Sequence, residues 1–136
     1  MPQHVAKATL LLAVLQCMGN SARAQSPDTT TSLRDGRYTE QQARRGERIY
    51  VEHCATCHAR EFFTDPFLLS WSGASVRLLF DVLSTSMPQD RPSSLKDQEY
   101  ADVLAYIFEM NGLPLGPREL PADREQLERI LIERRQ

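Results

Sequence analysis

The feature that most constrains this chain is the motif Cys54-Ala55-Thr56-Cys57-His58. On a helix, residues at i and i+3 lie on one face, so both thiols can meet the same edge of a flat ligand. His58 stands four positions after Cys54 and can bring its imidazole under that ligand. The chain therefore has to present two sulfurs and one imidazole to the same space.

C-x-x-C-H is the spacing of covalent haem attachment, in which two thiols form thioether bonds with the haem vinyl groups and the histidine binds the iron. Two other kinds of site use a C-x-x-C pair. A thioredoxin-like redox disulfide belongs to a βαβ context, and no strand pattern is visible here. A zinc site needs further ligands, and beyond residue 24 the only other cysteine or histidine is His53. The spacing favours one haem c, with the other two sites as alternatives.

Residues 1–24 have the three parts of a secretory signal peptide. Lys7 supplies the positive charge, an apolar run follows over 8–15, and small residues precede a cleavage site after Ala24. Cleavage removes Cys17 and leaves the two cysteines of the motif. An uncleaved anchor helix is the alternative, although the apolar run is short for a membrane span. Because bacteria attach haem outside the cytoplasm, we expect the mature chain in the periplasm.

Length and charge limit what the mature chain can be. The 136 residues are enough for one domain with its own core. No stretch of about 18 apolar residues occurs, so no membrane span is predicted in the mature chain. Removing Lys7 and Arg23 from the 16 basic residues leaves 14 against 18 acidic ones, a net charge of −4. That balance argues against nucleic-acid binding.

Hydrophobic periodicity predicts an all-α fold of four to five helices around one haem. A capping box of Thr39 and Gln42 begins a first helix that reaches about Cys54. Gly46 costs that helix about 1 kcal/mol relative to alanine, which indicates the close approach of another element. The other predicted segments are a flexible leader at 25–38, a loop at 59–74 with a helical turn at 66–70, a helix at 75–84, a loop at 86–94, a helix from 96 or 97 to 110, and a C-terminal extension at 115–136 with an amphipathic helix at about 122–133.

The iron of such a site needs a sixth ligand, and two methionines are candidates. Met87 follows His58 by 29 residues and precedes Pro88, in a loop between two helices that must pack around the haem. Met110 ends an apolar helix, where core packing explains it. The Met-Pro loop favours Met87 as the distal ligand. Histidine/methionine ligation raises the reduction potential and favours electron transfer over ligand binding.

Over residues 39–114 the chain resembles the class I c-type cytochromes. The resemblance is carried by Gly46, Tyr50, the C-x-x-C-H motif, Pro66, Met87-Pro88 and the segment 103–107. In that family the glycine of the first helix faces an aromatic residue of the last core helix, which implies that Gly46 faces Tyr106. We therefore expect the first and last core helices to cross closely at these two residues.

The resemblance also implies two residues that support the haem and its ligand. A proline carbonyl in the family accepts a hydrogen bond from the proximal histidine, and Pro66 is the matching position for His58. Trp71 is implied either as a hydrogen-bond donor to a haem propionate or as a residue that packs on the haem edge.

Further segments resemble the cytochrome subunits and domains associated with quinoprotein (PQQ) alcohol dehydrogenases. They are Trp71-Ser72-Gly73, Met87-Pro88, the late helix at 100–107, and the segments 111–114 and 119–121. This resemblance implies redox protein partners, namely a dehydrogenase as electron donor and an oxidase or another cytochrome as acceptor.

These observations predict a single-electron carrier, not an enzyme in its own right, that can serve as the electron-accepting subunit of a dehydrogenase. The residues expected to form the apolar wall of the haem pocket are Val76, Leu79, Phe80, Leu83, Leu104 and Ile107. A haem enzyme or gas sensor with an open or exchangeable sixth iron site is the alternative if Met87 does not reach the iron.

A third hypothesis makes the chain an assembly partner whose C-terminal extension docks on a larger subunit. The extension carries the basic residues Arg118, Arg124, Arg129, Arg134 and Arg135. A solvated helix face explains these charges more simply.

Overall fold

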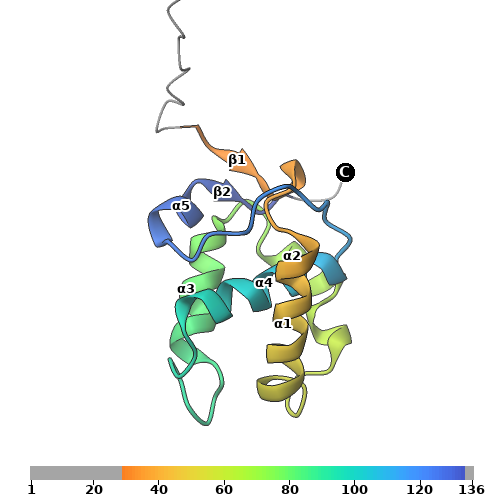
Figure 1. Cartoon of the computed structure of the whole chain (residues 1–136), viewed down its shortest axis with the longest axis vertical. Helices are drawn as coiled ribbons and strands as arrows, with labels where there is room; N and C mark the ends of the chain where they lie inside the picture. The colour runs from red at the N-terminus through yellow and green to blue at the C-terminus, as the bar shows by residue number, and fades with distance from the viewer. Residues whose placement is uncertain (1–28, 134–136) are drawn as a thin grey trace, which may run out of the picture.

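The computed structural model describes residues 29–133 and confirms the all-α fold (Figure 1). Its elements in chain order are β1 (Thr31–Ser32), η1 (Leu33–Asp35), α1 (Glu40–His53), η2 (Arg60–Phe63), α2 (Asp65–Ser70), α3 (Val76–Ser86), α4 (Asp97–Met110), α5 (Arg124–Glu128) and β2 (Ile130–Leu131). Among the described residues, no helix has the length and apolar character that a bilayer crossing requires. The predicted signal peptide at 1–24 and the first four residues of the predicted leader lie outside the described residues.

Helices α1 and α4 form the main contact of the core, and they touch at Gly46. A Cβ built at Gly46 would lie 1.8 Å from the carbonyl oxygen of Asp102 and 3.0 Å from the Cβ of Tyr106. The close approach predicted from this glycine is therefore present, and Tyr106 is one of the two residues that it meets. Beside the contact, Arg45 forms a bidentate ion pair with Asp102, at 2.8 and 3.0 Å.

One of the two hydrogen bonds of the predicted capping box is present at the start of α1. The hydroxyl of Thr39 accepts a hydrogen bond from the backbone N–H of Gln42 at 3.1 Å, as predicted. The side chain of Gln42 does not return to Thr39. It is fully buried, and its amide donates to the carbonyl of Leu120 at 2.9 Å and accepts from the N–H of Leu120 at 2.6 Å. Gln42 thus joins α1 to the C-terminal segment.

Residues 31–38 are packed on the domain, contrary to the expectation of a flexible leader. Leu33 and Tyr38 are fully buried, and the Tyr38 hydroxyl donates to the carbonyl of Leu113 at 2.6 Å. Strand β1 pairs in parallel with β2, with Thr31 opposite Ile130. Two apolar side chains and one strand pairing are enough to fix a segment that is otherwise polar.

The C-terminal extension also differs from the single helix predicted at 122–133. Helix α5 ends at Glu128, and the chain continues as β2. The burial pattern changes accordingly, because Ile130 and Ile132 are buried while Leu131 between them is only half-buried. Ile132 bonds through its main chain to residues 73 and 74. Burial thus alternates from residue to residue over 130–132, as it does in a strand, and isoleucine favours strands. Pairing with β1 replaces the last part of the predicted helix.

The middle of the chain follows the prediction more closely. The expected helix at 75–84 is α3, two residues longer at its end, and the expected helix ending at 110 is α4. The loop predicted at 59–74 contains the 3₁₀ turn η2 as well as the short helix α2. Figure 1 shows α1, α3 and α4 forming the body, with β1, β2 and α5 gathered at one end.

Candidate functional site

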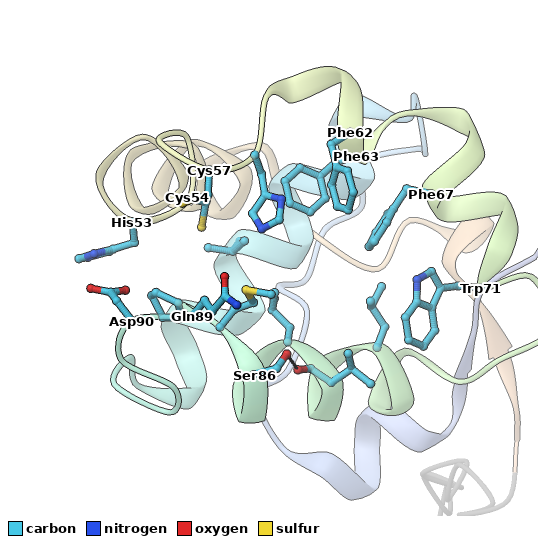
Figure 2. A pocket seen from close by; sticks show the side chains of 17 residues that line it. His53, Cys54, Cys57, Phe62, Phe63, Phe67, Trp71, Ser86, Gln89 and Asp90 are labelled. Atoms are coloured by element: carbon cyan, nitrogen blue, oxygen red, sulfur yellow. Dashed lines mark hydrogen bonds between the residues drawn. The ribbon is translucent and has the colours of Figure 1, made fainter.

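A cavity of about 770 Å³ lies between the end of α1, the segment η2–α2, and α3 with the loop that follows it (Figure 2). Its volume falls within the range of about 300–1,000 Å³ that is usual for ligand pockets. The lining residues, mostly aromatic or aliphatic, are His53, Cys54, Cys57, His58, Phe62, Phe63, Phe67, Trp71, Leu79, Val82, Leu83, Ser86, Met87, Pro88, Gln89, Asp90 and Val103.

The cysteine motif forms a tight turn directly after α1. The backbone N–H groups of Cys57 and His58 both donate to the carbonyl of Cys54, at 3.1 and 2.9 Å. The Tyr50 hydroxyl donates to the carbonyl of His58 at 2.6 Å, which closes the turn from the helix side. Both thiols are free and line the cavity together with His58. The local hydrogen bonds therefore bring the three functional groups to one cavity. The spacing argument assumed a helix for the motif, whereas the motif lies in the turn that follows α1.

The surroundings of the thiols argue against a redox disulfide. Catalytic C-x-x-C motifs lower the pKa of one thiol by placing it at a helix N-terminus. Here the motif follows the C-terminal end of α1, where the helix dipole disfavours a thiolate. Burial raises the pKa of the Cys54 thiol, and the neighbouring Cys57 adds to the increase. Both effects keep Cys54 protonated.

The side chains around the cavity do not supply a zinc site. Within residues 29–133, no group of three or more His, Cys, Asp or Glu side chains is placed to hold a metal ion. The C-x-x-C pair would need at least one more such ligand.

An aromatic cluster lines the cavity beside His58. The imidazole lies 4.8 Å from the ring of Phe62 and 5.5 Å from that of Phe63, measured between centroids. Phe67 packs against both phenylalanines and reaches Trp71 at 6.4 Å. Figure 2 shows these rings along one side of the cavity. The rings meet at steep angles, 89° between Phe62 and Phe63, and give the cavity an apolar lining beside His58.

Met87 reaches the same cavity from another element. It caps the C-terminal end of α3 directly after Ser86, and its N–H donates to the carbonyl of Leu83 at 2.9 Å. Its own carbonyl accepts a hydrogen bond from the buried hydroxyl of Tyr100 at 2.7 Å. Both backbone groups of Met87 are thus fixed by protein partners. Met110, the other methionine considered, packs against the core and is not among the lining residues.

Of the two supporting residues that the resemblance implied, one lines the cavity and the other does not. Trp71 lines the cavity. Pro66 lies in the first turn of α2 and does not line it. In a helix, residues four apart share a face, so the face that carries Phe67 and Trp71 into the cavity turns Pro66 away from it.

The expected apolar wall is correct only in part. Leu79 and Leu83 line the cavity, whereas Val76, Phe80, Leu104 and Ile107 are buried elsewhere in the core. The positions that sequence reasoning missed are Phe62, Phe63, Phe67, Val82 and Val103. The concentration of aromatic residues over 60–70 is the signal that could have located the first three.

Residues 41–107 match the family model for the cytochrome c oxidase, cbb3-type, subunit III. This stretch is a c-type cytochrome domain. No curated protein and no solved structure matches the chain. The match places a class I c-type cytochrome on the residues that build the cavity, from α1 to the greater part of α4.

The cytochrome domain binds one covalently attached haem c, and the residues present fit that group. Two free thiols, an imidazole and a thioether line the same cavity, and the remaining walls are mainly apolar. A domain of this kind is an electron-transfer module, and redox proteins are its partners.

Proposed function

We propose that this chain is an exported carrier of single electrons in which Cys54 and Cys57 hold the haem and His58 and Met87 are the axial iron ligands. The observation that carries the proposal is that His58 and Met87, 29 residues apart, line one cavity with both free thiols. The haem supplies the one-electron Fe(II)/Fe(III) couple when bound.

The protein's own residues set the conditions for that couple. The aromatic side chains beside His58 give that side of the cavity an apolar lining, and Leu79, Val82 and Leu83 of α3 do so on the Met87 side. A dry, apolar surrounding and a methionine ligand both favour a high reduction potential. Trp71 supports the cofactor through its indole, as a donor to a propionate or by packing on the edge.

The anchoring of Met87 favours a carrier over an enzyme or sensor with an open sixth site. A ligand that leaves the iron easily would require a loop free to move. Here the N–H and the carbonyl of Met87 are both bonded to protein groups, at 2.9 and 2.7 Å. A fixed ligand means little rearrangement between oxidation states, which suits electron transfer.

The proposal includes export and a partner. The predicted signal peptide at 1–24 and the extracytoplasmic site of haem attachment both support a periplasmic location. The matched family is named for an oxidase subunit, while the segments at 71–73, 111–114 and 119–121 resemble cytochromes of quinoprotein alcohol dehydrogenases. We infer that the chain accepts electrons from a dehydrogenase and passes them to an oxidase or another cytochrome.

The attachment is tested by the intact mass of the protein from the periplasm of a bacterium that matures c-type cytochromes. We expect a chain that begins at Gln25 and carries one haem that survives denaturation. The double variant Cys54→Ala/Cys57→Ala should carry none, while Cys17→Ala, inside the predicted signal peptide, should match the wild type. A haem-free wild-type chain with its two thiols oxidised to a disulfide would contradict the proposal.

The ligand assignment is tested by the reduction potential and by the weak far-red iron–methionine absorption band. Met87→Ala should lose the band and lower the potential. Met110→Ala is the matched control, because this methionine is half-buried and outside the cavity. Loss of the band in Met110→Ala instead would reassign the ligand. A wild-type protein without the band would favour the enzyme or sensor.

A further inference from the structure

One side of the cavity is formed by α3 and Met87, and it is held in place partly by residues C-terminal to the matched domain. Helix α3 supplies four of the lining residues on this side, and Met87 follows the helix directly. It contacts α5 at least as extensively as it contacts α4, whereas α4 packs mainly on α1. The position of α3 therefore depends on the C-terminal segment, which lies outside residues 41–107.

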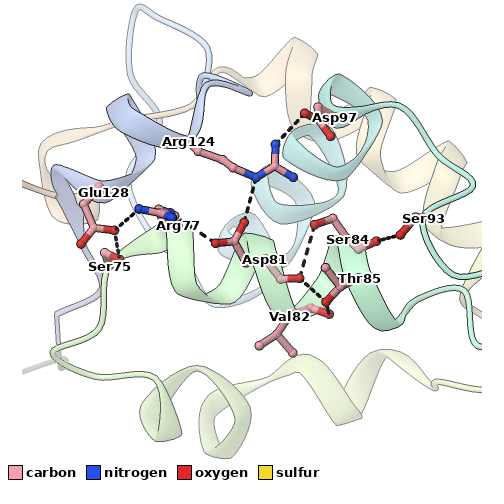
Figure 3. Close-up of polar contacts among 10 residues, drawn as sticks. All are labelled: Ser75, Arg77, Asp81, Val82, Ser84, Thr85, Ser93, Asp97, Arg124 and Glu128. Carbon is pink, nitrogen blue, oxygen red and sulfur yellow. Dashed lines mark hydrogen bonds and ion pairs between the residues drawn. The ribbon is translucent and has the colours of Figure 1, made fainter.

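One side chain of that segment joins the two helices that flank the Met87 loop. The Nε of Arg124 lies 2.9 Å from a carboxylate oxygen of Asp81 on α3. One of its terminal nitrogens lies 2.8 Å from a carboxylate oxygen of Asp97, the first residue of α4. Figure 3 shows this bridge from Asp81 through Arg124 to Asp97. The guanidinium also stands 5.0 Å above the ring of Phe80.

The bridge spans the whole segment that carries the proposed ligand. Residues 82–96, between the two carboxylates, include Met87 and the loop after it. On the inner side, the Tyr100 hydroxyl holds the Met87 carbonyl. Within the same segment, the Ser93 hydroxyl donates to the carbonyl of Ser84 at 3.0 Å. Arg124 adds a link between the two ends of this segment, through Asp81 and Asp97.

The solvent exposure of the three side chains limits how much the Arg124 bridge contributes to stability. The side chains of Arg124, Asp81 and Asp97 are 43%, 34% and 53% exposed, and an isolated pair of this kind contributes little. Arg124 engages two carboxylates and a ring at once, in a fixed planar geometry that lysine does not have. Removing it leaves Asp81 paired with Arg77 at 3.3 Å, so α3 should not unfold. The expected consequence is a looser Met87 loop in a folded protein.

We propose that Arg124 is a positioning residue for Met87, which holds α3 and α4 at the separation that keeps the methionine on the iron. The inference rests on the proposed His58/Met87 ligation. It gives the C-terminal extension a role within this chain, in place of a docking surface for a larger subunit.

The test is an imidazole titration of the ferric holoprotein, followed by loss of the far-red iron–methionine band. Imidazole must displace Met87, so its apparent affinity increases with the population in which the methionine is off the iron. Arg124→Ala should bind imidazole about fivefold more tightly than the wild type, and Arg124→Lys should fall between them. Arg129→Ala is the matched control, because the Arg129 side chain pairs with Glu125 of its own helical segment, and its loss should leave the affinity unchanged.

The outcomes separate this inference from the function on which it rests. A wild-type protein without the band refutes the ligand assignment. If the wild type has the band and Arg124→Ala binds imidazole with the same affinity, the inference alone is refuted. A lower thermal midpoint in that variant would not rescue it, because a purely structural role of Arg124 explains that result. If Arg124→Ala does not accumulate, Asp97→Asn removes one arm of the bridge and should still tighten imidazole binding about twofold.

Discussion

Replacing Gly46 with alanine sets two opposite effects against each other. Alanine is the better helix former by about 1 kcal/mol, so propensity alone predicts a more stable protein. In the structure, however, the new Cβ would stand 1.8 Å from the carbonyl oxygen of Asp102. Reaching an ordinary contact of 3.4 Å requires a displacement of about 1.6 Å. The obstructing atoms belong to the backbone of α4, which cannot rotate away.

The displacement must separate α1 from α4 at the main contact of the core. It would strain the Arg45–Asp102 ion pair and the ring contact between Tyr50 and Tyr106, whose centroids are 5.4 Å apart. Overpacking of a core costs about 1–3 kcal/mol, and a rigid backbone neighbour puts this site at the upper end. We expect a net loss of about 3 kcal/mol in the free energy of unfolding, which is a large share of a domain's stability.

Urea unfolding of the holoproteins, followed by far-ultraviolet circular dichroism, measures this loss. Gly73→Ala is the control for backbone strain, because Gly73 has a φ of +89° but no atom within 4 Å of an added Cβ. Its loss should be smaller, about 1–2 kcal/mol. A Gly46→Ala variant as stable as the wild type, or more stable, would show that α1 and α4 do not meet at this residue.

Three further predictions follow from buried polar groups. Gln42→Ala leaves the N–H and the carbonyl of Leu120 without their partner and should cost about 2–4 kcal/mol in urea unfolding; a loss below about 0.5 kcal/mol would contradict the pairing. Tyr100→Phe removes the donor to the Met87 carbonyl and should cost about 1–2 kcal/mol while tightening imidazole binding; unchanged imidazole affinity would separate the hydroxyl from the ligand loop. Burial, with a smaller contribution from Glu109, raises the pKa of Tyr38 to about 12. The unfolded chain releases that proton first, so stability should fall as the pH rises from about 10 to 12, and less steeply in Tyr38→Phe; equal slopes would contradict the shift.

The parts of the fold that were predictable from the sequence are those with a local signal. The cap at Thr39 and the apolar stripe of α4 each lie within one element, and the structure has them where the spacing indicated. The C-x-x-C-H motif is equally local, although it forms a turn after α1 and not part of the helix. Gly46 was informative because a glycine inside a helix needs a reason, and the reason is the α4 backbone.

The parts that were missed depend on contacts between distant segments. Nothing near residues 31–38 indicates that they pack on the domain, because Tyr38 bonds to Leu113, 75 residues later, and Thr31 pairs with Ile130 near the other end of the described chain. The extended segment 130–132, which contains β2, exists because β1 and residues 73–74 offer it hydrogen bonds. The lining of the cavity was misassigned for a related reason: α2 brings Phe67, not Pro66, to the site. Periodicity finds a buried face but does not say which buried face borders a ligand.

The central claim is tested most directly by the absorption spectrum of the exported protein, first oxidised, then reduced, then exposed to carbon monoxide. The account predicts the far-red iron–methionine band in the oxidised state, sharp α and β bands on reduction, and no change on adding carbon monoxide. A spectrum without haem, or a reduced protein that binds carbon monoxide readily, would contradict a carrier with His58 and Met87 on its iron.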